Sequence, residues 1–404
     1  MTLYIRPSDY RELLKPQGPL FAFIFPWLLV LVGQVAALCD IIIPVYSPFY
    51  LLVIGNMISA VVIAFFYQTF FPKKLALNRS SVSQIEIGPR FKRLVLLALK
   101  TYVAMQVIQA AYFKGLPLFW LLMKSGKTYA NYGIHSLNGL LNAIFLLGTT
   151  SLFIIYLKER KRWQLVMLCL MFCFPVLVVS RQLLISLFLQ IGCVAIIYSK
   201  RALRGLIMAG AFLLCLFVIV GNLRTGLSTI VTILGPKDFI PQALYPLLWI
   251  YAYIVTPFNN INAAFEDITP LGYPYHEIKT LIPSLFRNAI GLQGDDAGFS
   301  LVHQNMTVSS FYLEPLLDFG PAWAFIFVSL FQILLIGAFR RACTSRLPLH
   351  ILEYSILYMI AILSIFSNLL LYLPVVAQLL LLNLAKLKLF KRGKNWILAV
   401  HSKA

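Results

Sequence analysis

Acidic residues are scarce in this chain, and so are charged residues of any kind. Asp and Glu together number 14 of 404 residues against 34 Lys and Arg, and only 12% of the sequence is charged while 60% is hydrophobic. The mean hydropathy of +0.84 is far above that of a soluble domain. The composition therefore excludes a soluble fold.

Several motifs of soluble enzymes are also missing. The six cysteines show neither the paired spacing of a disulfide framework nor a zinc-ligand spacing, so we expect neither disulfides nor a metal site. No P-loop or dinucleotide-binding glycine pattern occurs, and we expect no cofactor. The N-terminal stretch lacks an apolar core followed by a small-residue cleavage site, so we expect no signal peptide to be removed.

Long apolar runs make up much of the sequence. A helix needs about 20 apolar residues to cross the hydrocarbon core, and a spanning helix satisfies its own backbone groups. We therefore predict an all-α polytopic membrane protein with about ten transmembrane helices. The runs lie near residues 19–38, 49–71, 94–113, 138–157, 163–179, 182–198, 205–222, 321–339, 348–366 and 368–385.

Basic residues gather in short blocks beside these runs. The blocks before the first run and after the second, fourth, sixth, eighth and tenth all fall on one side of the membrane, which is the positive-inside pattern. We predict that both termini are cytoplasmic. The net charge of +20 is then a topology signal, and we expect no nucleic-acid partner.

The polar residues indicate three parts of the chain. Residues 1–222 would hold seven transmembrane helices and a smaller periplasmic loop at 114–137, and residues 321–404 would hold three more and a basic cytoplasmic tail. Between them, 223–320 carries eight of the 14 acids and many Pro and Gly residues, which predicts one large periplasmic loop. Within it, the apolar, aromatic stretch near 241–258 is interpreted as an interfacial helix, with a true span as the open alternative.

Two Arg-Gly pairs in this loop share one spacing. Arg224 is followed by ten residues and then Gly235, and Arg287 is followed by ten residues and then Gly298. The run after Arg224 can form a helix that Gly235 ends, which would put Arg224 and Gly235 on one face about three turns apart. The Gly-containing residues after Arg287 predict a loop instead.

Arginine at the membrane surface offers planar, bidentate donors that suit phosphate or pyrophosphate. Arg181 stands in the short turn between the fifth and sixth runs. It joins Arg224 and Arg287 as a candidate because a charge at the membrane edge is costly. The open alternatives are ion pairs with loop acids for Arg224 and Arg287 and contact with lipid headgroups for Arg181.

His303 is the leading candidate for proton transfer, because a histidine titrates near neutral pH. Its alternative role is that of a hydrogen-bonded loop residue. Asp295 and Asp296 could bind a divalent cation, pair with arginine, or simply be solvated. The weaker histidine candidates are His135 and His276.

Taken together, these features resemble the Wzy-type O-antigen polymerases, also called oligosaccharide repeat-unit polymerases. In that family the two Arg motifs usually stand in separate periplasmic loops, whereas here they share one stretch. The segment before the eighth run is similar to the histidine-containing end of the catalytic loop in the related O-antigen ligases. The resemblance rests on ten or more spans, a large outer loop, the two Arg-Gly pairs, SRQLL around Arg181, and VHQNMTVSSFYLEPLLDFG with His303.

The resemblance implies a GT-C-like, metal-independent glycosyltransferase of the bacterial inner membrane. It would join oligosaccharide units carried on undecaprenyl pyrophosphate at the periplasmic face, with the growing glycan as donor and a new lipid-linked unit as acceptor. Arg181, Arg224 and Arg287 would hold the leaving pyrophosphate, and His303 or Glu314 would take the acceptor proton. A chain-length co-polymerase is a possible partner.

Two alternatives compete with this prediction. An O-antigen ligase needs the same donor site, so the arginines do not distinguish it. A lipid-linked oligosaccharide flippase or another transporter would place charges inside its spans near the midplane. Here the polar residues collect in 223–320, which favours chemistry at the membrane surface.

Overall fold

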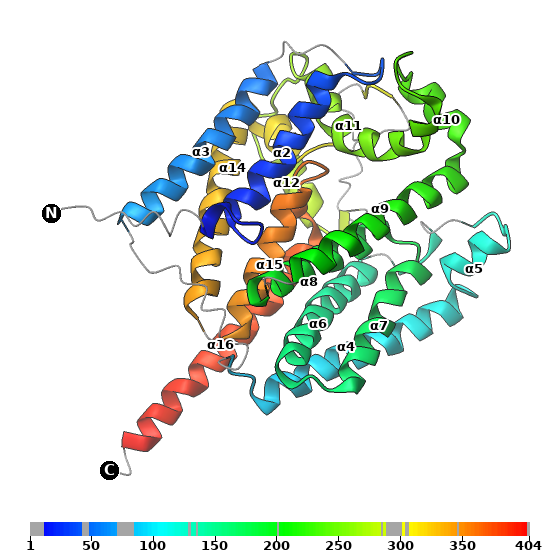
Figure 1. Cartoon of the computed structure of the whole chain (residues 1–404). Coiled ribbons are helices and arrows are strands. Elements are labelled where there is room, and N and C mark those ends of the chain that lie inside the picture. The colour runs from blue at the N-terminus through cyan, green and yellow to red at the C-terminus, as the bar shows by residue number, and fades with distance from the viewer. Residues whose placement is uncertain are drawn as a thin grey trace.

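The chain forms an all-helical architecture in the computed structural model (Figure 1). Within the described residues the only extended pairing is an isolated bridge between Cys39 and Pro236, so the all-α prediction is confirmed for them. The structure describes residues 12–42, 48–70, 85–127, 131–134, 136–199, 202–283, 286–287, 301–303, 307–345 and 347–401.

Among the described residues, six helices are long and apolar enough to cross a membrane. Each of the ten apolar runs in the sequence overlaps one of these six or one of four shorter apolar helices, as expected for a polytopic membrane protein. The six are α2 (Pro19–Ala36), α3 (Pro48–Phe70), α4 with α5 (Pro89–Tyr112 and Pro117–Leu122), α6 (Leu137–Glu159), α8 (Arg181–Tyr198) and α14 (Leu313–Thr344). The shorter apolar segments are α7 (Arg162–Leu177), Ala202–Cys215 within α9 (Ala202–Thr225), α15 (Pro348–Leu363), and Leu373–Leu387 within α16 (Leu373–His401).

Helix α15 lies at the centre of the bundle and packs against α2, α6, α8, α14 and α16. Most of its residues are buried on every side, as expected of a helix that is apolar all round. Two of its tyrosines bond backbone carbonyls that precede α2: the Tyr354 hydroxyl donates to the Gln17 carbonyl and the Tyr358 hydroxyl to the Pro16 carbonyl, at 2.7 Å each. Just past its end, Trp27 of α2 donates through Nε1 to Ser364 Oγ at 3.0 Å.

A chain of uncharged polar side chains joins three helices inside the bundle. Thr150 of α6 donates to Gln190 Oε1 of α8 at 3.1 Å. Gln190 Nε2 donates in turn to Gln378 Oε1 of α16 at 3.0 Å. These buried amides and hydroxyls satisfy one another where no water reaches, so they fix the register of the three helices.

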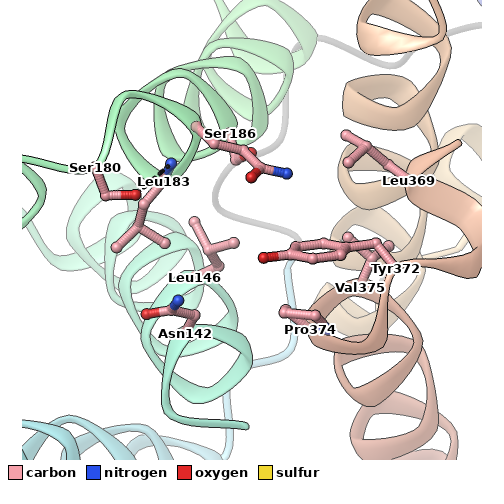
Figure 2. Close-up of a pocket in the computed structure, with 10 residues that line it drawn as sticks. Asn142, Leu146, Ser180, Leu183, Ser186, Leu369, Tyr372, Pro374 and Val375 are labelled. Carbon is pink, nitrogen blue, oxygen red and sulfur yellow. Dashed lines mark hydrogen bonds between the residues drawn. The ribbon is translucent and has the colours of Figure 1, made fainter. Parts of the chain in front are cut away.

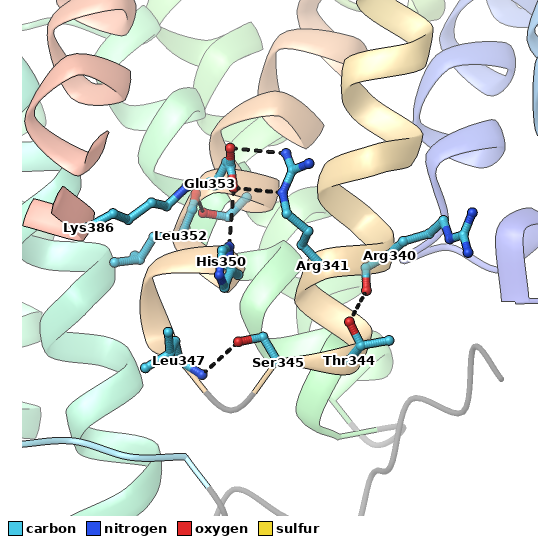
Figure 3. Close-up of polar contacts among 10 residues, drawn as sticks. Arg340, Arg341, Thr344, Ser345, Leu347, His350, Leu352, Glu353 and Lys386 are labelled. Atoms are coloured by element: carbon cyan, nitrogen blue, oxygen red, sulfur yellow. Dashed lines mark hydrogen bonds and ion pairs between the residues drawn. The ribbon is translucent and has the colours of Figure 1, made fainter. Parts of the chain in front are cut away.

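At one end of the bundle a single carboxylate ties α14, α15 and α16 together (Figure 3). Glu353 accepts from Arg341 Nη2 at 3.2 Å and pairs with Lys386 Nζ at 2.7 Å. His350 Nδ1 lies 3.5 Å from the same side chain. We call this the Glu353 end; the opposite end, where Arg181 begins α8 and α15 finishes, is the Arg181 end.

Most of the 223–320 segment that is described is helical. Helix α11 packs along the end of α2, where Tyr251 Oη donates to the Gly33 carbonyl at 2.9 Å and Gln34 Nε2 donates to the Val255 carbonyl at 2.9 Å. It runs beyond residue 258, and its interfacial position stays a prediction. The elements here are α10 (Leu227–Leu234), η2 (Gln242–Leu247), α11 (Leu248–Ala264) and α12 (Tyr275–Leu281).

Helix α14 is interrupted near its start. Gly320 has φ 80° and ψ −171°, a conformation that is essentially restricted to glycine, and Pro321 follows it. A Cβ atom on Gly320 would lie 3.0 Å from Pro270 Cγ. The break therefore reorients the first turns of α14 and lets the chain before α12 approach them closely.

Candidate functional site

Polar side chains converge where α12 meets the first turns of α14. The Asp318 carboxylate is fully buried, and it accepts from the backbone N–H groups of His276 and Glu277 at 2.9 Å each. Pro274, which precedes α12, has no side-chain group that could cap the helix. A carboxylate from another helix thus accepts hydrogen bonds from the N-terminal N–H groups of α12. Its negative charge is also attracted to the partial positive charge at that helix end.

The same carboxylate also orients a histidine ring. His276 Nδ1 lies 2.8 Å from Asp318 Oδ1, and the His276 side chain is 17% exposed. When Asp318 is ionised, Nδ1 carries the ring proton and donates a hydrogen bond to the carboxylate. The neutral ring then keeps a lone pair on Nε2, so the arrangement leaves Nε2 able to accept a proton.

Glu277, the next residue, has an environment of its own. Its Oε1 accepts from Trp323 Nε1 of α14 at 3.0 Å. Burial raises the pKa of the Glu277 carboxyl above its ordinary value, and the nearby Asp318 charge raises it further, while the Trp323 hydrogen bond opposes both. Carboxyls with a perturbed pKa cluster at functional sites, which makes Glu277 a candidate beside the histidine.

The substitution Glu277→Gln is expected to raise the thermal unfolding midpoint at pH 7 and not at pH 4. The folded chain holds the Glu277 proton more tightly than the unfolded chain, so this carboxyl lowers stability as pH rises above its unfolded pKa. Glutamine keeps an oxygen for Trp323 and carries no charge. Tryptophan fluorescence during heating of the detergent-solubilised protein measures this; an unchanged or lower midpoint at pH 7 would contradict it.

Glu314 lies in the first turn of α14, one turn before Asp318. Its Oε2 atom is shielded from solvent and makes no hydrogen bond with the described residues. It is close enough to Asp318 and Glu277 for their charges to interact. The structure therefore brings Glu314, one of the two proton-transfer candidates from the sequence, to the His276–Asp318 pair.

The other candidate, His303, lies in a different segment. Its neighbour Val302 donates to Asn260 Oδ1 of α11 at 3.1 Å, and Asn260 Nδ2 donates to the Val308 carbonyl at 2.9 Å. Asn260 thereby anchors the chain on both sides of His303. No described contact joins His303 to the His276–Asp318 pair, and its catalytic role stays a prediction.

Arg181 lies at the start of α8, after Ser180, whose Oγ accepts from the Leu183 N–H at 3.4 Å. Arg181 Nη1 lies 3.3 Å from Tyr253 Oη of α11 and donates to it. The Tyr253 ring in turn contacts Phe366, just after α15, with 6.2 Å between ring centroids. These contacts hold the Arg181 guanidinium at the surface where α8, α11 and the end of α15 meet.

The Arg224 region departs from the prediction in one respect. Gly235 does end a helix, with φ 59° and its N–H bonded to the Val231 carbonyl, as the sequence indicates. The single helix expected from Arg224 to Gly235 is wrong, because Gly226 at φ 85° separates α9 from α10. Glycine at a left-handed φ turns the chain there, so Arg224 and Gly235 do not share one helical face.

Arg287 lies in a short helical turn, with its backbone N–H bonded to the Pro283 carbonyl at 3.1 Å. Its Nε atom is shielded from solvent and has no hydrogen-bond partner among the described residues. A shielded guanidinium nitrogen without a partner is a candidate to bind an anion. The predicted loop residues Asp295, Asp296 and Gly298, together with His135, lie outside the described residues.

The sequence gives little sign of the His276–Asp318 pair. The two residues are 42 positions apart. Asp318 lies in the VHQNMTVSSFYLEPLLDFG segment, but His276 stands in no recognisable motif. Only the neighbourhood of Pro274 and Glu277 marks His276 as the start of a helix. The contact depends on how the chain between α11 and α14 folds back at Gly320, which no local pattern encodes.

Comparisons with known proteins give no family for this chain. No protein-family model matches it, and searches of curated proteins and of solved structures found no match either.

Proposed function

We propose that this protein is a polymerase of lipid-linked oligosaccharide repeat units, with a GT-C-like fold of ten transmembrane helices in the bacterial inner membrane. It transfers the growing glycan from its undecaprenyl pyrophosphate carrier to a hydroxyl group of a new lipid-linked unit. The observation that carries the proposal is the His276–Asp318 pair at the Arg181 end of the bundle, with Glu277 and Glu314 beside it.

The orientation of the chain follows from its basic residues. The Glu353 end carries Arg340, Arg341 and Lys386, and the positive-inside rule assigns such an end to the cytoplasm. The Arg181 end then faces the periplasm. A site at that surface is reached by polyprenyl carriers from the bilayer and by their glycans from the water phase.

The reaction uses a base and a group that stabilises the leaving pyrophosphate. The hydroxyl oxygen of the new lipid-linked unit forms a bond to the anomeric carbon of the donor. His276 Nε2 takes the proton of that hydroxyl group at the same time. The bond from that carbon to the pyrophosphate oxygen breaks, and the leaving group takes the electron pair. Arg181 and Arg287 stabilise its negative charge through fixed donors, and this transfer needs no metal ion.

Deletion of the gene followed by complementation tests this function on a lipopolysaccharide gel. A deletion strain with a single repeat unit on its lipid A-core, restored to a ladder by the wild-type gene, supports a polymerase. Bare core with ladders accumulating on the lipid carrier would identify a ligase, and absence of any repeat unit on core without such ladders would favour a flippase. A normal ladder in the deletion strain overturns the proposal.

A further inference from the structure

A small cavity opens between α6, α8 and the start of α16, one residue from Arg181 (Figure 2). It encloses about 30 Å³, room for one or two hydroxyl groups and not for a whole sugar ring. Helix α12, which carries His276, packs against both α16 and the adjoining η3 (Leu369–Leu371). The polar residues that line the cavity are Asn142, Ser180, Gln182, Ser186 and Tyr372, and the rest of the lining is leucine, valine and proline.

The polar side chains of this cavity have no partners within the described protein. Asn142, Gln182, Ser186 and Tyr372 make no side-chain hydrogen bond to any described residue. Ser186 is only 4% exposed as a residue, whereas Gln182 and Tyr372 are exposed, so the polar groups run from the surface into the cavity. Figure 2 shows the Tyr372 hydroxyl pointing from the α16 side toward Leu146 and Asn142. These groups are arranged to bond something that enters the cavity.

The chemistry of the lining selects the kind of ligand. None of the ten residues is charged, so the cavity offers a phosphate no counter-charge. An isoprenoid chain would leave the amides and hydroxyls unsatisfied. A neutral sugar suits both parts, because its hydroxyls bond amides and hydroxyls while its C–H faces pack against leucine, proline and aromatic side chains.

The unpaired polar side chains of the cavity end one helical turn further along α8 and α16. Gln190 lies one helical turn beyond Ser186 on α8, and Gln378 lies one turn beyond Pro374 on α16. Gln190 donates a hydrogen bond to Gln378 and accepts one from Thr150. Because these amides bond each other, they offer no unpaired group to a ligand one turn further along α8 and α16.

We propose that this pocket binds the edge of a neutral sugar residue in the glycan, with the ring resting at the mouth against Tyr372. The inference rests on the proposed function. It places a sugar between Arg181, which would hold the pyrophosphate, and α12, which carries the base. A polar pocket of this kind would set which repeat unit is accepted.

Binding of the released repeat unit tests the proposal directly. The probe is the strain's own repeat-unit oligosaccharide, cleaved from its carrier by mild acid, and saturation-transfer difference NMR with the detergent-solubilised full chain measures its binding. We expect Tyr372→Phe and Asn142→Leu each to weaken binding about three- to tenfold, the loss of one neutral hydrogen bond. Ser186→Phe fills the pocket and abolishes binding.

Two control variants make the same changes elsewhere. Tyr112→Phe removes a hydroxyl from a tyrosine that is 73% exposed at the end of α4, and Val166→Phe adds bulk on α7 at a residue that is 58% exposed; both should bind like wild type. Equal binding by wild type, Tyr372→Phe and Asn142→Leu, or no binding by wild type, overturns the pocket. If the wild-type gene restores the ladder in cells while these variants bind normally, the pocket fails and the polymerase proposal stands. If the deletion strain has a normal ladder while the variants bind the oligosaccharide more weakly than wild type, the polymerase proposal fails and the pocket stands.

Discussion

His276→Ala is expected to abolish the lipopolysaccharide ladder and leave a single repeat unit on core. Loss of a positioned base typically lowers a reaction rate by about 10²–10⁴-fold, which is enough to stop polymerisation on the timescale of growth. The ring makes one described hydrogen bond, to Asp318, and is partly exposed, so its removal leaves no large cavity. The gel of the complemented deletion strain, with the variant quantified in the membrane fraction, measures the result.

The comparison that decides between the two histidines is His303→Ala, made in the same strain. If the ladder survives His303→Ala and disappears with His276→Ala, His276 is the base. The opposite pattern would contradict the assignment. Asp318→Asn adds a further test, because it removes the negative charge beside the His276 ring and replaces Oδ2, the acceptor for the Glu277 backbone N–H, with an NH2 group that cannot accept. It should lose the ladder and also lower the thermal unfolding midpoint.

Gly320→Ala is expected to destabilise the protein by about 1–3 kcal/mol, the usual cost of forcing a side chain into a backbone conformation reserved for glycine. The new methyl group would also meet Pro270 Cγ at 3.0 Å. Because Pro270 leads into α12, the displacement should move His276 relative to Asp318 and shorten the ladder as well. Thermal unfolding followed by tryptophan fluorescence in detergent measures the first effect, and the gel measures the second.

The same helix supplies a matched control for that substitution. Gly337 lies later in α14, where an added Cβ would have its nearest neighbours, Arg341 Nη1 and Tyr67 Oη, at 3.6 Å. Gly337→Ala should therefore change stability little, within about 0.5 kcal/mol. Equal unfolding midpoints for the two variants would show that the break at Gly320 is not a strained position.

The sequence is informative about helices because each spanning helix is encoded by a contiguous apolar run. Every run has its counterpart among the helices, and Gly235 ends α10 as its local signal indicates. The sequence does not predict the break at Gly226, because a glycine inside a helical pattern is often tolerated and its φ is set by the surrounding fold.

The candidate site is harder to predict because its parts are distant in the chain. From the sequence, Glu314 is a candidate base only through the family resemblance, and His276 is only a weaker histidine candidate. What distinguishes His276 from His303 is the buried carboxylate of Asp318, and that contact is long-range. Arg181 could be singled out at the membrane edge, but its contact with Tyr253 depends on the tertiary position of α11.

The contacts of α2 and of the residues just before it affect how the chain assembles during synthesis. Trp27 bonds Ser364, and the Gln17 carbonyl bonds Tyr354; each partner lies 337 residues further along the chain. At about 5–20 residues per second, the ribosome adds these partners tens of seconds after the first helix has emerged. Until then α2 waits in the bilayer with these groups unpaired, which is tolerable because they carry no charge. Closure of the bundle is thus a late event in synthesis, and a ribosome that stalls before α15 leaves the first helix without its native neighbours.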